Sequence, residues 1–508
     1  MLRVTVSLCI LISVPVLYFI ERTRVSLSEQ VCWRLTWLLS ALLAGLMLAI
    51  NWLQVRNMCG MEVDTGIILN SLYNTSLGHF FYNSHELGSH FGFHNSPILL
   101  LLYPLYLLIP NHWALIGPAI AGIAVSVPFV YRIARVWLAP GAALCLTAAY
   151  MINPVVISQA LPEFHEMNLA ILPMVLILYH YFVTRKFGSC VLWIAVLMAV
   201  KESMSITVLA LGVASLIQGR KWHWWAVPAT MALAGTALSL GIVMPLFSSS
   251  GSVHTMRKLF GQETLGDVIR HILTNPGALM EAIKPAEMGN TYLMLLSWGV
   301  VPVLLSAWTL VAVLHMVLLL LMENSFSLRL WDAAILGPLL AVGVAIGICR
   351  LARFCSSDAA ELPGKQTQTA ALVLLLAIAM GAVWIRPSSF EKPANLEAVR
   401  YAVRMVPDHA SLTVSGRLAP YLHRRHILRS APWWLADDVL DGFPMSEFIL
   451  VTWDNGSRAQ LLAVGTEQSR KRVEHWDDFT RRLMSGDRPY NYELQYARDG
   501  VYLARLTD

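Results

Sequence analysis

Charged residues are scarce in this 508-residue sequence: Asp, Glu, Lys and Arg make up 14% of it, against 56% hydrophobic residues. Soluble globular domains carry about 25% charged residues, so this composition excludes an ordinary soluble protein. The net charge of +5 is small, and the arginines lie at the ends of apolar runs and form no basic stripe. Nucleic-acid binding is therefore excluded as well, and the composition predicts a multi-span membrane protein.

Cysteine is also scarce. The seven cysteines, at positions 9, 32, 59, 145, 190, 349 and 355, lack the paired spacing of a disulfide framework or a zinc knuckle. A cleavage site of small residues is missing after the first apolar run, residues 4–20, which is followed by the charged stretch ERTR. We therefore interpret this run as a retained helix and not as a signal peptide.

Long apolar runs are abundant. A helix needs roughly 17 to 25 apolar residues to cross a hydrocarbon core about 30 Å thick, and shorter runs fit a bundle with broken helices. The expected spans are residues 4–20, 34–55, 112–132, 138–153, 168–184, 188–200, 203–218, 223–247, 289–305, 306–322, 328–349 and 368–386. The run 97–110 has prolines at both ends and at 104 and reaches only about 21 Å, which predicts an interfacial or re-entrant helix. We expect a mainly α bundle of about 11 to 13 spans.

The basic residues at the ends of the runs predict the orientation of the bundle. The positive-inside rule assigns these groups to the cytoplasmic side: Arg22, Arg24 and Arg34; Arg132 and Arg135; Arg185 and Lys186; Arg220 and Lys221; Arg350 and Arg353. The outer side then holds the loops 56–111, 154–167 and 248–288, the break at 200–203, and everything after residue 386.

The last quarter of the chain has a different composition. Residues 387–508 hold 16 Lys and Arg and 16 Asp and Glu, which is 32 of the 69 charged residues in the whole chain. Patterning predicts strands at 411–416 and 447–453, a helix at 476–486 and a hairpin at 492–506 that turns at Asp499-Gly500. We therefore expect a transmembrane bundle over 1–386 and a small extracytoplasmic α/β domain over 387–508.

Four clusters of polar residues interrupt the apolar sequence, and the predicted orientation places all of them on the outer side. They are Glu62 with Asp64; His90 and His94 with Ser96; Glu163, His165, Glu166 and Asn168; and Lys201 with Glu202. Ionisable residues at a membrane boundary are costly unless they are paired or solvated, so they indicate a functional site. Together they offer a general base, imidazole or hard-metal ligands, and a cation for a phosphate.

Each cluster also has a purely structural explanation. Asp64 can be the N-cap of a helix, and Ser96 before a proline is typical of a capped helix start. Glu163 suits the positive end of the helix expected after it. Lys201 and Glu202 can simply pair with each other. Four independent explanations of this kind do not explain why all four clusters are predicted on the same side of the membrane. Their common side favours a functional site.

Several stretches resemble, in order and spacing, the bacterial membrane family of unknown function DUF2079. They are VDTGIILNSLYNTSLGHFFY, HFGFHNSPILLLLYPLYLLIP, ALPEFHEMNLA, VKESMSITVL and, in the tail, VPDHASLTVSGRLAPYLHRRHIL and DGVYLARL. The family pattern is approximately D-x-G, H-F-S-P-I-L-L-L, F-H-P-E and K-E-D. Departures occur at His94-Asn95, where the family has a single Phe, at Met167, which shifts the acid to Glu166, at Ser203, which replaces an acid, and in 288–350, which lacks a His-Tyr pair.

That family in turn resembles the GT-C superfamily of glycosyltransferases. The resemblance implies inverting transfer of a sugar from a polyprenyl-phosphate donor to a lipid, glycan or protein acceptor, at the outer face of the bacterial inner membrane. It implies catalytic roles for Asp64, as the general base, and for Glu166. The side chains assigned to substrate binding are His90, His94, His165, Lys201 and Glu202. Metal dependence stays open, since Asp64, Glu166, His165 and a loop histidine can also hold a divalent cation.

Two other classes of protein remain as alternatives. The first is a secondary transporter or lipid flippase that uses Lys201 and Glu202 as a coupling pair, and the second is a non-catalytic assembly or sensor protein. Transporters often contain two related halves with interrupted spans at corresponding positions. Residues 1–250 and 251–508 differ in loop length, charge and tail, which favours the transferase.

Overall fold

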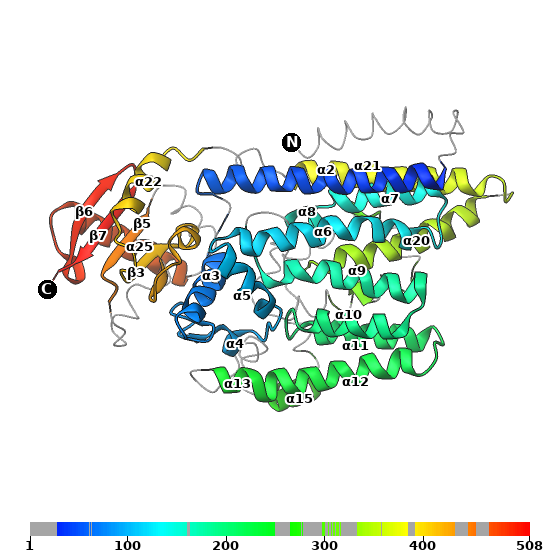
Figure 1. Ribbon diagram of the computed structural model, residues 1–508, viewed down its shortest axis with the longest axis horizontal. Coiled ribbons are helices and arrows are strands. Elements are labelled where there is room, and N and C mark those ends of the chain that lie inside the picture. Colours follow the sequence, from blue (N-terminus) through cyan, green and yellow to red (C-terminus); the bar gives the residue numbers. More distant parts are fainter. Residues whose placement is uncertain are drawn as a thin grey trace.

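The computed structural model describes residues 28–248 apart from 60, 62 and 160–162; residues 265–275; single residues and short pieces between 277 and 315; residues 333–384 apart from 357; and residues 392–431, 445–453 and 467–507. The spans expected at 4–20, 289–305 and 306–322 lie wholly or mostly outside these residues, as does Glu62. The described part consists of a bundle of long helices and a small sheet domain beyond one end of the bundle (Figure 1).

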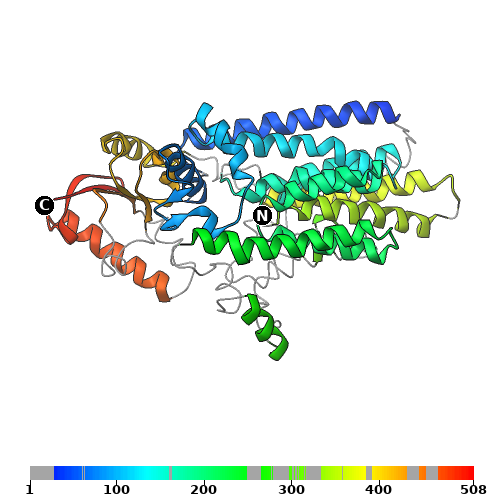
Figure 2. The same ribbon diagram turned by 60° about the horizontal axis from the view of Figure 1, so that its bottom comes forward.

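Apolar helices lie side by side in the bundle (Figure 2). Among the described residues, the helices long and apolar enough to cross a membrane are α2 (Glu29–Arg56), α6 (Trp113–Ala134), the continuous helix η1, α9 and η2 (Glu166–Thr184), the continuous helix α12, η3 and α13 (His223–Phe247), and α20 (Leu336–Cys355). Shorter or less apolar helices complete it: α7 (Pro140–Ile152), α8 (Pro154–Ser158), α10 (Phe187–Met198), α11 (Met204–Ile217) and α21 (Leu362–Trp384). These helices coincide with the spans expected in the described residues.

The outermost helices carry apolar residues outside and polar residues inside, as a bilayer requires. On α2, Leu42 and Leu46 are each 59% exposed and Trp52 is 54% exposed. Ser40 of the same helix is buried and donates a 2.6 Å hydrogen bond to the carbonyl oxygen of Ala124 on α6. This inverted pattern confirms a membrane bundle, because a soluble helix would bury the leucines.

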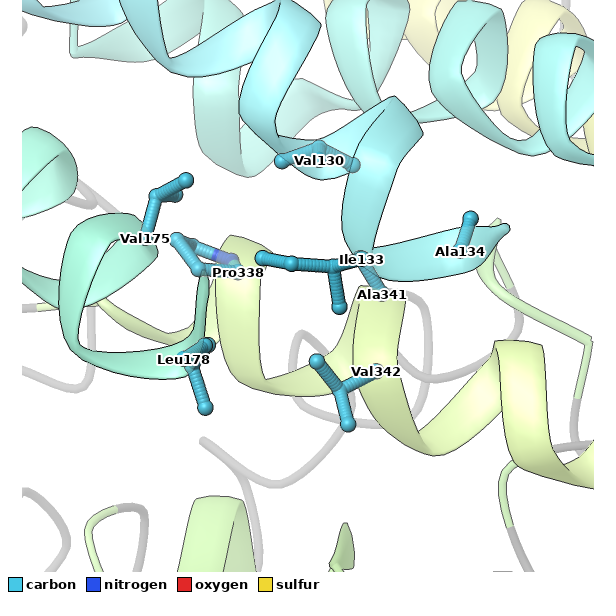
Figure 3. A pocket seen from close by; sticks show the side chains of 8 residues that line it. All are labelled: Val130, Ile133, Ala134, Val175, Leu178, Pro338, Ala341 and Val342. Carbon is cyan, nitrogen blue, oxygen red and sulfur yellow. The ribbon is translucent and has the colours of Figure 1, made fainter. Parts of the chain in front are cut away.

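The centre of the bundle is closely packed. A gap of about 10 Å³ between α6, α9 and α20 has the size of a single water molecule (Figure 3). Its lining is wholly apolar: Val130, Ile133, Ala134, Val175, Leu178, Pro338, Ala341 and Val342. A gap this small and apolar is a packing defect and has no room for a ligand.

The C-terminal sheet has the strand order β4-β3-β5-β7-β6, with β3, β4 and β5 parallel and β5, β7 and β6 antiparallel. The strands are β3 (Leu412–Ser415), β4 (Leu428–Ala431), β5 (Phe448–Thr452), β6 (Tyr492–Arg498) and β7 (Val501–Leu506). Helix α22 (Leu396–Met405) packs on one face with Phe448 and Leu450, and α25 (Glu467–Met484) packs on the other with Ile449 and Val451. A strand covered on both faces needs the continuous apolar run seen in β5.

The expected strands and hairpin coincide with β3, β5, β6 and β7. At the hairpin turn, Asp499 and Gly500 have φ values of 50° and 73°, the left-handed pair of a two-residue turn. Helix α25 begins at Glu467, earlier than the expected start at 476, and β4 was not expected at all.

Short elements occupy the space between the bundle and the sheet domain (Figure 1). They are α3 (Val63–Ser76), the strand pair β1 (Tyr82–Asn83) and β2 (Gly88–Ser89), α4 (His90–Phe93) and α5 (Leu99–Leu108). The ten residues of α5 rise only about 15 Å, too little to cross a bilayer. Leu101 and Leu108 of α5 are 71% and 80% exposed while Tyr106 is buried, as expected of a helix at the membrane interface.

Candidate functional site

Ionisable side chains from separate segments meet at the end of the bundle nearest the sheet domain. The ammonium nitrogen of Lys201, in the turn between α10 and α11, lies 3.1 Å from Oε1 of Glu166 at the start of η1. Oε2 of Glu166 lies 3.3 Å from Nδ1 of His165. Glu166 is only 1% exposed and Lys201 6%. Charges buried this deeply persist only when they are paired, so the pairs hold the segments together.

A second polar contact links the loop before α5 to the same turn. His94 Nδ1 lies 3.1 Å from Oε1 of Glu202, and the backbone N–H of Asn95 donates to Oε2 of Glu202 at 3.0 Å. Glu202 is 6% exposed. The two neighbouring residues of the turn thus engage different segments: Lys201 meets η1, and Glu202 meets the histidine loop.

The two ring nitrogens of His90 have different surroundings. Its Nδ1 lies 3.0 Å from both carboxylate oxygens of Glu86, and its ring centroid lies 5.8 Å from that of His94. His90 is 3% exposed, and its Nε2 is buried with no hydrogen-bond partner among the described residues. A carboxylate on one ring nitrogen fixes the imidazole and directs the other nitrogen away, as in many metal and catalytic sites.

The pair also fixes the charge of His90. Burial by itself would lower the pKa of His90, but the charge of Glu86 and its hydrogen bond outweigh burial and raise the pKa to about 9. Burial would raise the pKa of Glu86, but the charge of His90 and the hydrogen bonds to that carboxylate lower it. At neutral pH the pair is therefore an imidazolium and a carboxylate, with an N–H at the unpartnered Nε2.

Asp64 lies in the first turn of α3 and is partly exposed. The next residue anchors the turn: Thr65 donates from its backbone N–H and its hydroxyl to the carboxylate of Glu163, at 3.3 and 3.0 Å. The hydroxyl of Thr65 also accepts from the N–H of Phe164 at 2.8 Å. The prediction that Glu163 serves its own following helix is wrong, because its carboxylate sits at the start of α3, where backbone N–H groups need acceptors.

His85 connects Asp64 to the buried pairs. It lies within electrostatic reach of both Asp64 and Glu86, and its burial lowers its pKa. Asp64 thus lies at the open edge of the cluster, beside the segment 163–166. Of the other predicted residues, His90, His165, Glu166, Lys201 and Glu202 are buried and His94 is partly exposed.

The sheet domain holds α3 from the opposite side. The side-chain amide of Asn70 donates to the carbonyl oxygens of His423 and Arg425 at 2.9 and 2.7 Å. At Gly66, an added Cβ would lie 2.6 Å from Cβ of Ala419 in η6 (Gly416–Leu422) and 3.2 Å from its backbone carbon. Only glycine permits this approach, which gives a physical reason for the glycine two residues after Asp64.

Of the structural explanations, the one for Ser96 is wrong and the one for Lys201 and Glu202 is incomplete. The hydroxyl of Ser96 is buried and has no hydrogen-bond partner among the described residues, and α5 begins at Leu99 without a side-chain cap, so the capping prediction for Ser96 is wrong. Lys201 and Glu202 do interact electrostatically, but Lys201 also contacts Glu166 and Glu202 also contacts His94, so pairing with each other does not by itself account for them.

Glu86, His85 and the anchoring role of Glu163 were not expected from the sequence. The only available signal for Glu86 was a carboxylate four residues before His90, a spacing that predicts a pair on a helix. Residues 82–89 instead form a short strand pair with a turn, so helical spacing gave no reason to pair them.

The described residues do not supply a preformed metal centre. No three His, Cys, Asp or Glu side chains in this part of the chain converge as metal ligands. The carboxylate of Glu166, the acid at the centre of the cluster, is engaged by the Lys201 ammonium and by His165. The arrangement favours the binding of an anion by cations already in place.

These features define a class: a multi-pass membrane protein with a buried charged site at one end of its helix bundle, beside an α/β domain. The chain belongs to the family described as predicted membrane protein DUF2079, whose model matches residues 54–503. This confirms the family expected from the sequence. No curated protein matches the chain.

Solved structures resemble the whole chain. The crystal structure of ArnT from Cupriavidus metallidurans bound to undecaprenyl phosphate matches with a TM-score of 0.51 and 11% identity, over 91% of this chain and 97% of ArnT. The structure of the same protein in the apo state gives a TM-score of 0.49 and 12% identity, over 94% and 98%. The first likeness confirms the expected fold class, a mainly α membrane bundle of ArnT-like fold with a small C-terminal domain.

Proposed function

We propose that this protein is a membrane glycosyltransferase that moves a sugar from a polyprenyl-phosphate donor to a lipid, glycan or protein acceptor. The observation that carries the proposal is the juxtaposition of a partly exposed carboxylate, Asp64, with buried cations, Lys201 and His90, at one end of a membrane bundle. The undecaprenyl phosphate bound to ArnT, a protein of the same fold, supports the class of donor.

The cations are suited to the phosphate of the donor. Lys201 and the Nε2–H of His90 both bear positive charge, and charge-assisted hydrogen bonds to phosphate oxygens are among the strongest available. The Nε2–H has no partner among the described residues, so a phosphate oxygen can satisfy it. In the proposal, Glu166 and Glu86 hold these two cations in position, and Glu202 holds His94.

The reaction we propose is a single displacement with inversion at the anomeric carbon. The acceptor hydroxyl oxygen attacks this carbon, Asp64 takes the hydroxyl proton, and the bond between the anomeric carbon and the phosphate oxygen breaks. The polyprenyl phosphate leaves with the electron pair of that bond, and the cations stabilise the added negative charge. His165, next to Glu166, is left to position the acceptor.

The proposal includes the placement of the site in the cell. We divide the chain into a transmembrane bundle, residues 1–386, and an extracytoplasmic domain, residues 387–508, in the bacterial inner membrane. The contacts of the sheet domain with α3 support this division, because both then face the outer side. Those of the basic residues assigned to the cytoplasm that the structure describes lie at the opposite ends of the helices.

Replacing Asp64 by Asn tests the general base. The amide keeps the size of the side chain but cannot accept the proton, so we expect transfer to fall by about 10² to 10⁴-fold. The measurement is transfer of label from polyprenyl-phosphate-linked sugars in membranes that contain the protein. Glu447→Gln, at an exposed acid of the sheet domain, is the matched control and should retain transfer. Full transfer by a folded Asp64→Asn variant would contradict the proposed role.

A further inference from the structure

A second pocket lies at the end of the bundle away from the candidate site. It has a volume of about 340 Å³ and is formed where α6, η2, α11 and α20 end or approach their ends. The helix Glu166–Thr184 begins in the candidate site and ends at this pocket; its 19 residues rise roughly 28 Å. That length is close to the thickness of a hydrocarbon core, so the two sites face opposite leaflets.

Three arginines from three different segments line the pocket: Arg185, Arg220 and Arg350. None of the described lining residues has a carboxylate. The guanidinium of Arg220 packs over the ring of Tyr181 at 4.7 Å, and Arg185 ends η2 with a left-handed φ of 53°. Membrane orientation requires basic residues at this end but does not require them to converge on one cavity.

The wall of the pocket is aromatic. The Phe182 ring lies 4.9 Å from both the Trp137 ring and the Trp308 ring, and Phe182 and Trp308 are buried. A cationic rim on an aromatic wall matches a ligand with an anionic head and an apolar body. The volume falls in the range of small-molecule sites and accommodates a headgroup.

We infer that this pocket binds the phosphate headgroup of an anionic phospholipid from the leaflet at this end of the bundle. Positive-inside orientation makes this the cytoplasmic leaflet, whose lipids attract basic pockets between transmembrane helices. The inference is independent of glycosyl transfer, because it uses none of the residues of the candidate site. Free inorganic phosphate carries the same chemistry, and the experiment separates the two sources.

The chain offers a matched set of controls for this pocket. Lys186, Lys221 and Arg353 are each within three residues of a pocket arginine but do not line the pocket. A triple variant R185Q/R220Q/R350Q therefore loses the same charge, at the same face, as the triple variant K186Q/K221Q/R353Q. Retention of phosphatidylglycerol and of phosphatidylcholine by the full-length protein in detergent is measured by native mass spectrometry, for the wild type and both variants.

We expect the wild type and the control triple to retain phosphatidylglycerol over phosphatidylcholine, and the pocket triple to lose at least about ten-fold in phosphatidylglycerol affinity. If the pocket triple variant and the control triple variant retain phosphatidylglycerol equally well, or lose it to the same extent, the inference is overturned. Inorganic phosphate is tested in the same way. If millimolar phosphate displaces phosphatidylglycerol, and phosphate alone raises the melting temperature of the protein as much as the lipid does, the lipid is not the ligand. If the pocket triple does not fold, R350Q against R353Q on α20 gives the same comparison.

Discussion

At the scale of single residues, the charge of His90 depends on one carboxylate. Its folded-state pKa of about 9 lies above the ordinary value of 6.5 for histidine. The raised pKa of His90 therefore contributes stability that is fully present below pH 6.5 and is lost as the pH rises through about 9. Under the proposed function, binding of a phosphate by the imidazolium should follow the same pH window.

Replacing Glu86 by Gln removes the carboxylate charge that raises the pKa of His90. Burial then lowers the pKa of His90, so the imidazole is neutral at pH 7 and phosphate binding weakens. We expect binding of undecaprenyl phosphate to weaken as the pH rises in both proteins. In the wild type the midpoint of this loss should lie near pH 9, and in Glu86→Gln it should lie at a pH below 6.5. The measurement is a binding titration from pH 5.5 to pH 10. In a His90→Asn background, adding Glu86→Gln should not shift the pH dependence of binding any further. If Glu86→Gln alone leaves the wild-type pH profile unchanged, the role of the pair is refuted.

The sequence identified most residues of the candidate site but not their partners. Hydropathy and the positions of the arginines predicted that Asp64, His90, Glu166 and Lys201 share one side of the membrane, and the structure brings them together at one end of the bundle. Which acid meets which cation depends on how the loops turn. The sequence does not predict the pairing of Glu86 with His90, because it arises in a strand pair and its turn, which have no regular spacing.

At the scale of elements, α3 is a helix with unusually many buried polar groups. Asn70, Ser71 and Asn74 are at most 1% exposed. Buried amides require hydrogen-bond partners, and those of Asn70 are backbone carbonyls of the sheet domain. The placement of Asp64 therefore depends on contacts along the whole length of α3.

Gly66→Ala tests this dependence. The new methyl group would clash with Ala419, so α3 and η6 must separate, and overpacking of this kind costs about 1 to 3 kcal/mol. We expect a lower melting temperature and faster hydrogen exchange in residues 412–422. Gly45→Ala is the control: it lies within α2 with nothing within 4 Å of the added Cβ, so it should be neutral or slightly stabilising. Equal effects of both changes would contradict the close contact.

The sheet domain shows which elements a sequence can predict. Strand β5 has a continuous apolar run, and the hairpin has Asp-Gly at its turn, so both were expected. Strand β4 is a four-residue edge strand that includes a buried arginine, Arg429, and it has neither signal.

At the scale of the whole molecule, His423 joins the sheet domain to the short apolar helix α5. Its Nδ1–H donates to the carbonyl oxygen of Pro420 at 2.8 Å, so its Nε2 accepts from the hydroxyl of Tyr106 at 3.0 Å. Burial lowers the pKa of His423 to about 4. The folded state therefore holds this histidine neutral, and the stability of the contact is present above pH 6.5 and lost as the pH falls toward 4.

We expect acid to loosen the sheet domain from the bundle. Hydrogen exchange in residues 412–431 should be faster at pH 5 than at pH 7, after correction for the intrinsic rate. In His423→Asn the side chain does not titrate, so the difference between the two pH values should shrink. An undiminished difference in the variant would assign the effect to another group.

The sequence predicted the two parts of the molecule from composition alone but not their contact. Docking uses backbone carbonyls and amide side chains, such as Asn70 with His423 and Arg425. These groups occur everywhere in a chain and leave no pattern that could be recognised in advance.

The anchoring of α3 also sets the order in which the protein can mature. Glu163 follows Thr65 by 98 positions, and His423 follows Asn70 by 353. At a synthesis rate of about 5 to 20 residues per second, α3 waits roughly 20 to 70 seconds for its last partners to leave the ribosome. A nascent or truncated chain thus contains Asp64 before the contacts that hold α3 in place can form. Under the proposed function, transfer activity would arise only after residues 423–425 have been delivered to the same side as α3.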